Sequence, residues 1–367
     1  MAASLNVVVN GIEFDNPFLL GSGPPGTNAK VIMKSFDLGW GGNVCKTISL
    51  DHSKVINTNP RYAKLRDPDD RKKVWGFENI ELISDRPFET WLEEFREIKK
   101  RYPKHILVAS IMEEYRKEAW VEIVERVQET GVDAFEMNLS CPHGLPERRM
   151  GAAMGANPEI VREVVGWVKE VSKIQVWAKM TPNVGDPTAS PKAAVESGVD
   201  GISAINTILS VIGVDLDTLR PMPTVEGYTT PGGYSGQAAR PIALRHVMEI
   251  ARSVPENVSI SGMGGIYTGG DAAQFVALGS HTVQVCTGAM LQGYKVVSKL
   301  KEQLIAVLDK HGYTSLDQLR GVSLPYFTTH FDLVDRQRQA KKDLGLERDA
   351  STWKGEIDKE TDALTAN

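Results

Sequence analysis

The fold is decided by a stretch near the middle of the chain, VDAFEMNLSCPHG at residues 132–144. Its first half, up to Met137, is a largely apolar run of the kind that forms a buried strand. Its second half is a loop interrupted by Pro142 and Gly144, and this loop carries Cys141. The pattern places a thiol just past the carboxyl end of a strand, where (β/α)8 barrels carry their chemistry.

Cys141 has two interpretations. Free cysteine is among the most buried residue types, so this side chain fits a structural core position. Its place at a strand end, directly before Pro142 and His143, favours a reactive thiol instead. The loop runs on to Gly155, and its length and its glycines are typical of a lid over a site.

The same rhythm of strand and helix recurs along the chain. Seven further apolar runs fit buried strands, at residues 18–23, 42–47, 105–111, 174–180, 200–207, 258–262 and 282–287. Helical segments separate them, as over 88–102, where Trp91, Leu92, Phe95 and Ile98 share one face. Eight strands alternating with helices predict an α/β fold, a closed (β/α)8 TIM barrel.

Two kinds of addition frame the barrel. An Asn-Gly turn at residues 10–11 predicts an N-terminal β-hairpin over 7–14. Two βα loops are long, at about 48–87 and 208–240. The second is rich in Gly, Pro and Thr, as a cover over a substrate site would be. We therefore expect insertions in the βα loops above the barrel.

Composition limits the classes of function. The 367 residues are 41% apolar and 24% charged with a net charge of −5, which gives no indication of nucleic-acid binding. The chain has no run of about 18 apolar residues and no signal-peptide core, so no membrane association is expected. We expect a barrel domain over residues 1–325 and a helical, charged C-terminal extension over 326–367. The charged end fits either a frayed tail or an arm on another subunit.

The cysteine count limits the redox chemistry. Cys45, Cys141 and Cys286 are far apart, which suits a reducing compartment rather than a disulfide framework. An all-cysteine iron–sulfur cluster needs four thiolates, so neither such a cluster nor another metal site is expected. Cys45 fits a core position. We expect a cytoplasmic protein, or a plastid one if a leader peptide has been removed.

Polar side chains recur where the predicted strands end, namely Lys46, Asn138, Lys179 and the pair Asn206–Thr207. Barrel interiors favour branched apolar residues, so polar strand ends indicate a site. One lysine alone fits a surface position equally well, and one asparagine alone fits a turn or cap. Together with Asn79, the amides can both donate to and accept from a planar ring such as a pyrimidine.

The loops after the seventh and eighth strands are rich in glycine, with GMGG at 262–265 and CTG at 286–288. Barrels commonly bind phosphate through these loops, where backbone N–H groups point at the anion. Turns need glycine too, so it is the combination with the barrel order that favours a phosphate-bearing cofactor. A lysine in the middle of such a barrel suits the electron-rich N1–C2 edge of a reduced flavin.

Four stretches resemble a known family. NIELI at 79–83, NLSCPHG at 138–144, WAKMTPN at 177–183 and QVCT at 284–287 are similar to the FMN-binding barrel of dihydropyrimidine dehydrogenase. The resemblance covers about residues 5–329 and is to the compact, plant- and bacterial-type single barrel. The wider superfamily includes the class 1 dihydroorotate dehydrogenases, which also place a cysteine on this loop. The pairing of NIE with CPHG favours the pyrimidine reductase.

The resemblance implies FMN-dependent reduction of uracil and thymine to 5,6-dihydropyrimidines, the first step of pyrimidine catabolism. Cys141 would be the general acid that protonates C5, opposite a hydride added to C6. The pyrimidine would be held by Asn79, Glu81, Ile83, Asn138, Asn206 and Thr207. FMN would be held by Gly21, Ser22, Lys46, Thr47, Asn138, Lys179, Gly233, Gly264, Gly265, Cys286 and Thr287. Ser140 and His143 would support the thiol.

The same resemblance leaves the electron source open between NADPH and NADH. The large animal-type enzyme carries iron–sulfur clusters and separate FAD and NADPH domains, and the bacterial catalytic subunit often carries a ferredoxin-like module. Three scattered cysteines exclude that module here. Either NAD(P)H reduces FMN directly or a separate reductase subunit delivers the electrons. A homodimer is the expected assembly.

Two alternatives to pyrimidine reduction stay open. Dihydroorotate oxidation would use the thiol as a thiolate base and would need a cationic anchor for the orotate carboxylate. A redox-inert barrel that serves as a scaffold subunit is the other alternative. The presence of Cys141, Lys46 and Lys179 argues against it.

Overall fold

The computed structural model describes residues 3–142, 150–343 and 361. Eight parallel strands close into a barrel in the order β3, β4, β7, β8, β9, β10, β15, β16. In that order they span Phe18–Leu20, Gly42–Val44, Ile106–Ile111, Ala134–Asn138, Gln175–Lys179, Gly201–Ala204, Ser259–Met263 and Thr282–Val285. The predicted TIM barrel is confirmed.

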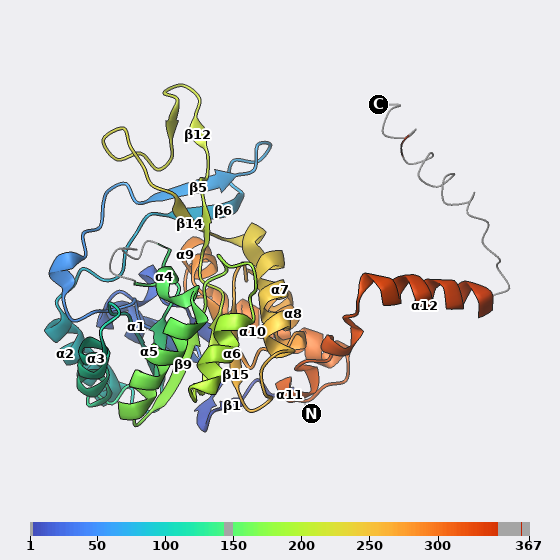
Figure 1. The fold of residues 1–367 in the computed structure, drawn as a ribbon, viewed down its shortest axis with the longest axis horizontal. Helices are drawn as coiled ribbons and strands as arrows, with labels where there is room; N and C mark the ends of the chain where they lie inside the picture. Colours follow the sequence, from blue (N-terminus) through green and yellow to red (C-terminus); the bar gives the residue numbers. More distant parts are fainter. Residues whose placement is uncertain (1–2, 143–149, 344–360, 362–367) are drawn as a thin grey trace. The chain divides into compact units, whose positions relative to one another are not determined.

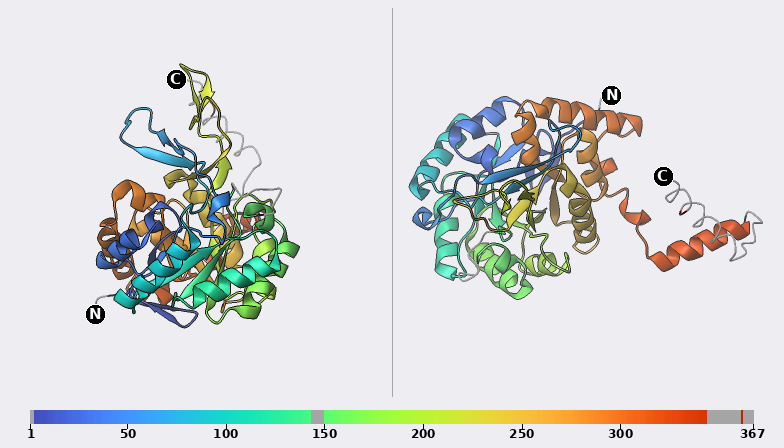
Figure 2. Two further views of the ribbon diagram at one scale, coloured as in Figure 1. Left: turned by 90° about the vertical axis from the view of Figure 1, so that its left-hand side faces the viewer. Right: turned by 90° about the horizontal axis from the view of Figure 1, so that it is seen from above.

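Helices surround this barrel, as the view from above shows (Figures 1 and 2). They are α1 Ala29–Asp37, α2 Phe88–Arg101, α3 Lys117–Gln128, α4 Ala152–Gly155, α5 Pro158–Val171, α6 Ala189–Glu196, α7 Arg240–Ala251, α8 Gly269–Ala277, α9 Thr287–Gln292, α10 Val296–Lys310 and α11 Leu316–Leu319. In α2 the predicted apolar face is buried: Trp91, Leu92, Phe95 and Ile98 are each at most 3% exposed. Burial of that face fixes α2 against the barrel wall.

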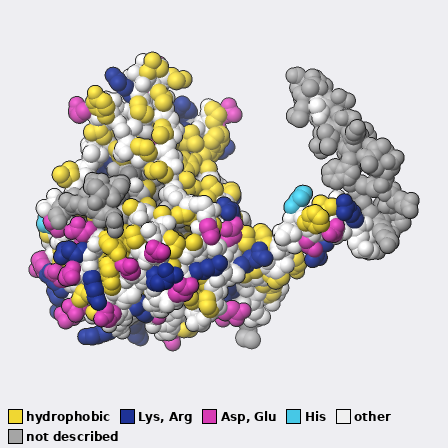
Figure 3. Space-filling view, in the orientation of Figure 1, with side chains coloured by type: hydrophobic (Ala, Val, Ile, Leu, Met, Phe, Trp, Pro, Cys, Tyr) yellow, Lys and Arg dark blue, Asp and Glu magenta, His cyan; other side chains and the backbone are white. Residues whose placement is uncertain are grey.

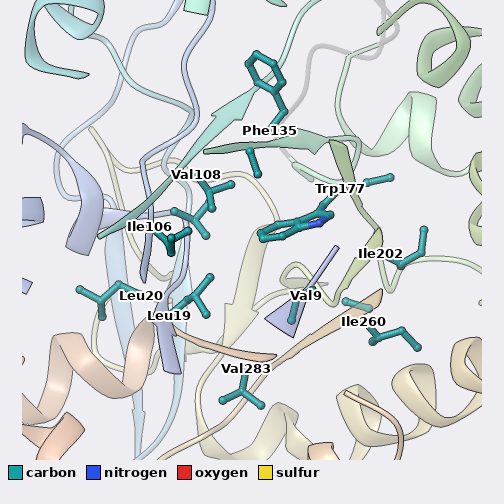
Figure 4. Packing of buried hydrophobic residues seen from close by; sticks show 14 of the residues in the cluster. Val9, Leu19, Leu20, Ile106, Val108, Phe135, Trp177, Ile202, Ile260 and Val283 are labelled. Atoms are coloured by element: carbon teal, nitrogen blue, oxygen red, sulfur yellow. The ribbon is translucent and has the colours of Figure 1, made fainter. Parts of the chain in front are cut away.

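The N-terminal hairpin closes the amino end of the barrel. Strands β1 (Val7–Val9) and β2 (Ile12–Phe14) pair antiparallel around Asn10 and Gly11, which both have positive φ. Asn10 donates to the carbonyl of Asp200 at 2.8 Å and accepts from the Trp177 indole at 3.0 Å. Val9 and Trp177 lie among the buried apolar side chains of the barrel (Figure 4).

A second sheet, which we call the cover sheet, lies on the carboxyl side of the barrel (Figure 1). It consists of β11 (Ile208–Ser210), β14 (Gly232–Ser235), β6 (Val74–Asn79) and β5 (Tyr62–Arg66), all paired antiparallel. β12 (Val214–Asp215) and β13 (Arg220–Pro221) form a separate short ribbon. All six strands come from the two long βα loops, and the sequence pattern did not predict them.

The carboxyl ends of the strands differ from the prediction in detail. β10 ends at Ala204, so Asn206 and Thr207 lie in the following loop rather than in the strand. β4 ends at Val44, two residues before Lys46. The apolar runs continue past the last ladder pairs, and this is why the sequence pattern overestimates these strand lengths.

The chain divides into two compact units, Met1–Leu324 and Pro325–Asn367. The second unit contains α12 (His330–Asp343), which begins with exposed Phe331 and Leu333. The charged end predicted as a tail or an arm lies mostly outside the described residues. No helix within the described residues has the length and apolar character needed to span a membrane.

Candidate active site

A cavity lies between the carboxyl end of the barrel and the cover sheet. Its lining includes every predicted site residue except Gly233: Gly21, Ser22, Lys46, Thr47, Asn79, Glu81, Ile83, Asn138, Cys141, Lys179, Asn206, Thr207, Gly264, Gly265, Cys286 and Thr287. Residues from seven different strand-end loops and from the cover sheet therefore meet at one place.

Gly233, also predicted to hold FMN, is not among the lining residues of the cavity. It lies in β14, where its carbonyl accepts from the Asn79 amide at 3.1 Å. A Cβ at this position would come within 2.2 Å of Thr207 Oγ1. The absence of a side chain at Gly233 therefore lets the cover sheet approach Thr207. The Gly233 carbonyl orients Asn79, which lines the cavity.

Cys141 is 7% exposed and packs with Ile83 and Met112 in a small apolar cluster. Its carbonyl accepts from the Ala152 N–H at 3.0 Å. At Gly151, which has φ 57°, a Cβ would come within 2.5 Å of that carbonyl oxygen. The backbone around the thiol is thus closely packed against the start of α4. His143 and the middle of the predicted lid, residues 143–149, lie outside the described residues.

A chain of hydrogen bonds connects the amides at the strand ends. Asn138 donates to Thr47 Oγ1 at 2.9 Å and accepts from Ser140 Oγ at 2.9 Å. Asn206 donates to the same Ser140 hydroxyl at 2.9 Å. Ser140, predicted to support the thiol, therefore connects Asn138 to Asn206. These bonds connect the amide at the end of β8 with the amide in the loop after β10, although β9 lies between the two strands.

Lys46 forms an ion pair with a residue of the long βα loop. Its ammonium lies 2.9 Å from Glu81 Oε2, and Arg61 lies 3.0 Å from Glu81 Oε1. The Lys46 and Glu81 side chains are only 9% and 8% exposed. Burial, followed by the charge of Glu81, raises the pKa of the neighbouring Tyr62 hydroxyl. Glu81 thus shares one negative charge between Lys46 and Arg61, so it pairs with the Lys46 ammonium while the group of three side chains keeps a net positive charge.

Lys179 also forms an ion pair, but with a residue inside the barrel. Its ammonium lies 3.2 Å from Oε1 of Glu136, and the two side chains are 5% and 0% exposed. The other carboxylate oxygen of Glu136 accepts from Gln284 Nε2 at 2.6 Å. Gln284 Oε1 is buried, has no hydrogen-bond partner, and belongs to a residue of the cavity lining.

The glycine-rich loops come together at one end of the cavity. Gly264, Gly265 and Gly236 have φ values of 130°, 73° and 99°, a region that favours glycine. A Cβ at Gly265 would come within 2.8 Å of Arg240 Cβ and of the Gly236 carbonyl. These close approaches leave backbone, rather than side chains, exposed to the cavity at this end. Such a surface suits a phosphate group.

Cys286 lies at the floor of the cavity beside both lysines. Burial raises the pKa of its thiol to about 11, although Lys179 and Lys46 act in the opposite direction. The thiol is therefore neutral near pH 7, so Cys286 contributes packing rather than charge. Cys45, expected as a core residue, is fully buried, and burial raises its pKa to about 12.

Several residues in the cavity lining, or paired with a lining residue, were missed by sequence reasoning. Glu136 and Gln284 are polar residues within apolar strands, and that contrast was the signal for them. Arg61 has no comparable signal, because its contact with Glu81 depends on the pairing of β5 with β6. Aromatic side chains of the cover sheet complete the lining, namely Tyr62, Phe77 and Tyr234. Among the described residues, no group of His, Cys, Asp or Glu forms a metal site.

Comparison with known proteins agrees with this geometry. The chain is 53% identical over 376 residues to the chloroplastic dihydropyrimidine dehydrogenase (NADP(+)) of Arabidopsis thaliana, covering 99% of this chain and 88% of the relative. It is 40% identical over 325 residues to the NAD-dependent dihydropyrimidine dehydrogenase subunit PreA of Escherichia coli (strain K12), covering 88% and 77%.

A more distant relative is the catalytic subunit of dihydroorotate dehydrogenase B (NAD(+)) from Pyrococcus abyssi, 35% identical over 87% of this chain and 99% of its own length. The family model described as dihydroorotate dehydrogenase matches residues 4–308, a range that includes all eight barrel strands. The chain therefore belongs to the dihydroorotate dehydrogenase family.

Proposed function

We propose that this protein reduces uracil and thymine to their 5,6-dihydro forms with FMN as the bound cofactor and NAD(P)H as the electron source. The observation that carries the proposal is the cavity itself. Two thiols, two lysines and three asparagines line it together, beneath the cover sheet. The names of the Arabidopsis and E. coli relatives support the same reaction.

The cavity residues fit FMN. The unpartnered Oε1 of Gln284 offers a buried acceptor, which a flavin ring N–H would satisfy. The backbone surface at Gly236, Gly264 and Gly265 would hold the phosphate. Lys46, Lys179, Ser22, Thr47 and Thr287 would bind the remaining polar edges, in line with the predicted cofactor set. The Gly233 carbonyl would support this site by holding Asn79.

FMN, when bound, supplies the hydride that C6 of the pyrimidine receives. The Cys141 thiol supplies the proton at C5, and free thiols are mostly protonated at neutral pH. Asn79, Asn138 and Asn206 orient the ring through its alternating carbonyl and N–H groups. The bonds of Ser140 to Asn138 and Asn206 hold two of these amides in place before the substrate arrives. Ile83 packs beside the thiol and excludes water from it.

Glu81 favours a neutral pyrimidine over orotate. An orotate carboxylate needs an uncompensated cation, yet both lysines of the described cavity lining already face carboxylates. Glu81 also occupies Lys46 and Arg61, the two cations that such a carboxylate would otherwise contact. For uracil or thymine the same carboxylate can accept a ring N–H. Dihydroorotate oxidation therefore remains the second candidate, supported by the P. abyssi relative but opposed by Glu81.

A separate reductase subunit is the proposed source of electrons, because the E. coli relative is itself named as a subunit. Exposed apolar side chains on the cover sheet and its neighbouring loops support contact with another chain, either a reductase or a second copy in a homodimer (Figure 3). They include Trp75, Leu209, Val211, Leu216, Leu219 and Tyr228. The name of the Arabidopsis relative supports a plastid location over the cytoplasm.

The proposal is tested by a single-turnover experiment in the forward direction. Protein reconstituted with FMN is photoreduced without oxygen and mixed with uracil, thymine or orotate. We expect uracil and thymine to restore the oxidised flavin spectrum within seconds, and orotate to act at least tenfold more slowly. Fast reoxidation by orotate alone would establish the second candidate. Failure of the protein to take up FMN would exclude both.

A further inference from the structure

The barrel interior below the cavity holds a layer of polar side chains. Glu136, Lys179, Ser203, Ser261 and Gln284 come from five different strands and meet there. All five are buried. Barrel interiors are usually filled by branched apolar side chains, and a buried carboxylate costs free energy unless it is compensated. Such a layer calls for a specific explanation.

Glu136 determines how the Gln284 amide is oriented. An ionised carboxylate only accepts hydrogen bonds, so Gln284 must turn its nitrogen toward Oε2, where the distance is 2.6 Å. The same nitrogen lies 3.4 Å from Ser203 Oγ and 3.3 Å from Ser261 Oγ. The amide carbonyl then faces the other way. A Cβ built on Gly21 would lie 3.4 Å from this oxygen, which places it at the wall of the cavity.

Glu136 also compensates the charge of Lys179. Its Oε1 faces the ammonium at 3.2 Å, and no hydrogen bond to that oxygen is formed. Since Glu136 is completely buried, solvent screens its charge little. A ring bound in the cavity beside Lys179 would therefore experience a nearly neutral ion pair and not an isolated cation.

We propose that Glu136 is a positioning residue that lowers the reduction potential of the bound flavin. It does so by compensating Lys179 and by presenting the Gln284 carbonyl as an acceptor. Reduction adds electron density to the ring, so a nearby negative charge opposes it and a nearby cation promotes it. The inference rests on the proposed FMN site, and it adds that the barrel interior tunes the cofactor.

The test is the midpoint potential of FMN bound to the Glu136→Gln variant, measured by equilibration with a redox dye in the absence of substrate. The substitution removes the charge and keeps the shape. We expect reduced FMN to bind about tenfold more tightly relative to oxidised FMN than in the wild type, which corresponds to a rise of about 30 mV for a two-electron couple. An unchanged potential would overturn the inference.

Asp133→Asn is the matched control, since it removes a carboxylate paired with Lys99 at the other end of β8. Asp133→Asn should alter the free energy of unfolding and leave the midpoint potential of FMN unchanged. If Glu136 had only a structural role, Glu136→Gln would give this same result. The double variant Glu136→Gln/Lys179→Gln removes both charges. Its affinity for reduced FMN relative to oxidised FMN should therefore return to within threefold of the wild-type ratio. A double variant that keeps the full rise would contradict compensation.

A second variant decides the matter if Glu136→Gln does not fold. Gln284→Met removes the proposed acceptor, so oxidised FMN should bind to the apoprotein about tenfold more weakly. Unchanged FMN affinity and potential would overturn the inference. A different result would contradict the proposed function, namely that the wild-type apoprotein binds no FMN at all. If it binds FMN and reduces uracil while these variants behave as the wild type, only the inference about Glu136 fails.

Discussion

Strand β8 has a lysine–carboxylate pair near each end, and the two pairs differ in how completely their hydrogen bonds are satisfied. At the amino end, Lys99 lies 2.9 and 2.7 Å from the two oxygens of Asp133. The Leu107 N–H donates to Asp133 at 2.8 Å, and Lys99 also donates to the His105 carbonyl at 2.8 Å. Near the carboxyl end, Glu136 Oε1 has no hydrogen bond.

The amino end repeats its arrangement further along the chain. Asp200 accepts from Lys169 at 2.6 Å and from the Val176 N–H at 2.8 Å, and like Asp133 it follows a Gly-Val pair. Both aspartates thus join a helix to the next strand. The carboxyl end, by contrast, leaves buried hydrogen-bonding capacity unused at Glu136 and Gln284. Unused capacity destabilises a fold, and a bound ring that fills it recovers that free energy.

The difference between the ends predicts the effect of substitutions. Changes at the residues that line the cavity should alter binding and turnover more than the free energy of unfolding. Changes at the amino end should alter the free energy of unfolding and leave the reaction intact.

The largest expected effect is that of Cys141→Ala. Loss of a general acid usually lowers turnover by about 10²–10⁴-fold, while FMN content and the thermal midpoint should stay near the wild-type values. Steady-state rates with uracil and flavin absorbance check this. Cys45→Ala is the matched control, because Cys45 is buried beside Ser110, outside the cavity lining. Turnover of Cys141→Ala near that of the control would contradict the role of the thiol.

Glu81→Gln should have the next largest effect. It leaves Lys46 and Arg61 without their shared carboxylate, and an orotate carboxylate can then bind there. We expect the ratio of kcat/KM for dihydroorotate to that for dihydrouracil to rise about a hundredfold, or about 2.7 kcal/mol. Glu78→Gln, at a buried carboxylate of β6 bonded to Ser210, is the control. An unchanged ratio would mean that Glu81 does not select the substrate.

The smallest expected effect is a loss of stability at low pH, and it comes from His281 at the amino end of the barrel. His281 accepts from the Ile260 N–H at 3.1 Å, and burial, followed by the charge of Arg320, lowers its pKa to about 4. The unfolded chain binds a proton near pH 6.5 and the folded chain does not. Its contribution to stability is therefore complete above pH 6.5 and is lost as the pH falls toward 4.

With allowance for partial solvent screening, we expect this loss to amount to about 1–2 kcal/mol. Urea unfolding at pH 7 and pH 4.5 measures it. His281→Asn keeps an acceptor for the Ile260 N–H and removes the titration, so it should lose less stability over this interval than the wild type. An equal loss in both proteins would show that His281 does not cause it.

The sequence allowed the barrel, the hairpin and about half of the cavity lining to be predicted. Apolar runs of strand length and polar residues at their ends are local signals, so Cys141, Lys46 and Lys179 could be found without coordinates. The cover sheet could not, because exposed residues such as Trp75 and Leu65 interrupt any clear alternation in β5 and β6.

The contacts between distant strands were also beyond the sequence. Glu136 and Gln284 are 148 residues apart and meet only because the barrel closes. Arg61 reaches Glu81 only through the pairing of Tyr62 with Asn79 in the cover sheet. Local patterns identify the residue types at a site, whereas closure of the barrel determines which of them compensate one another.

The measurement that tests this account most directly is the visible spectrum of the FMN-loaded protein during anaerobic addition of dihydrouracil and, separately, dihydroorotate. We predict that dihydrouracil bleaches the flavin and that dihydroorotate leaves it oxidised on the same timescale. Bleaching by dihydroorotate alone, or by neither compound, would contradict the claim that the carboxyl end of this barrel is built for a flavin and a neutral pyrimidine.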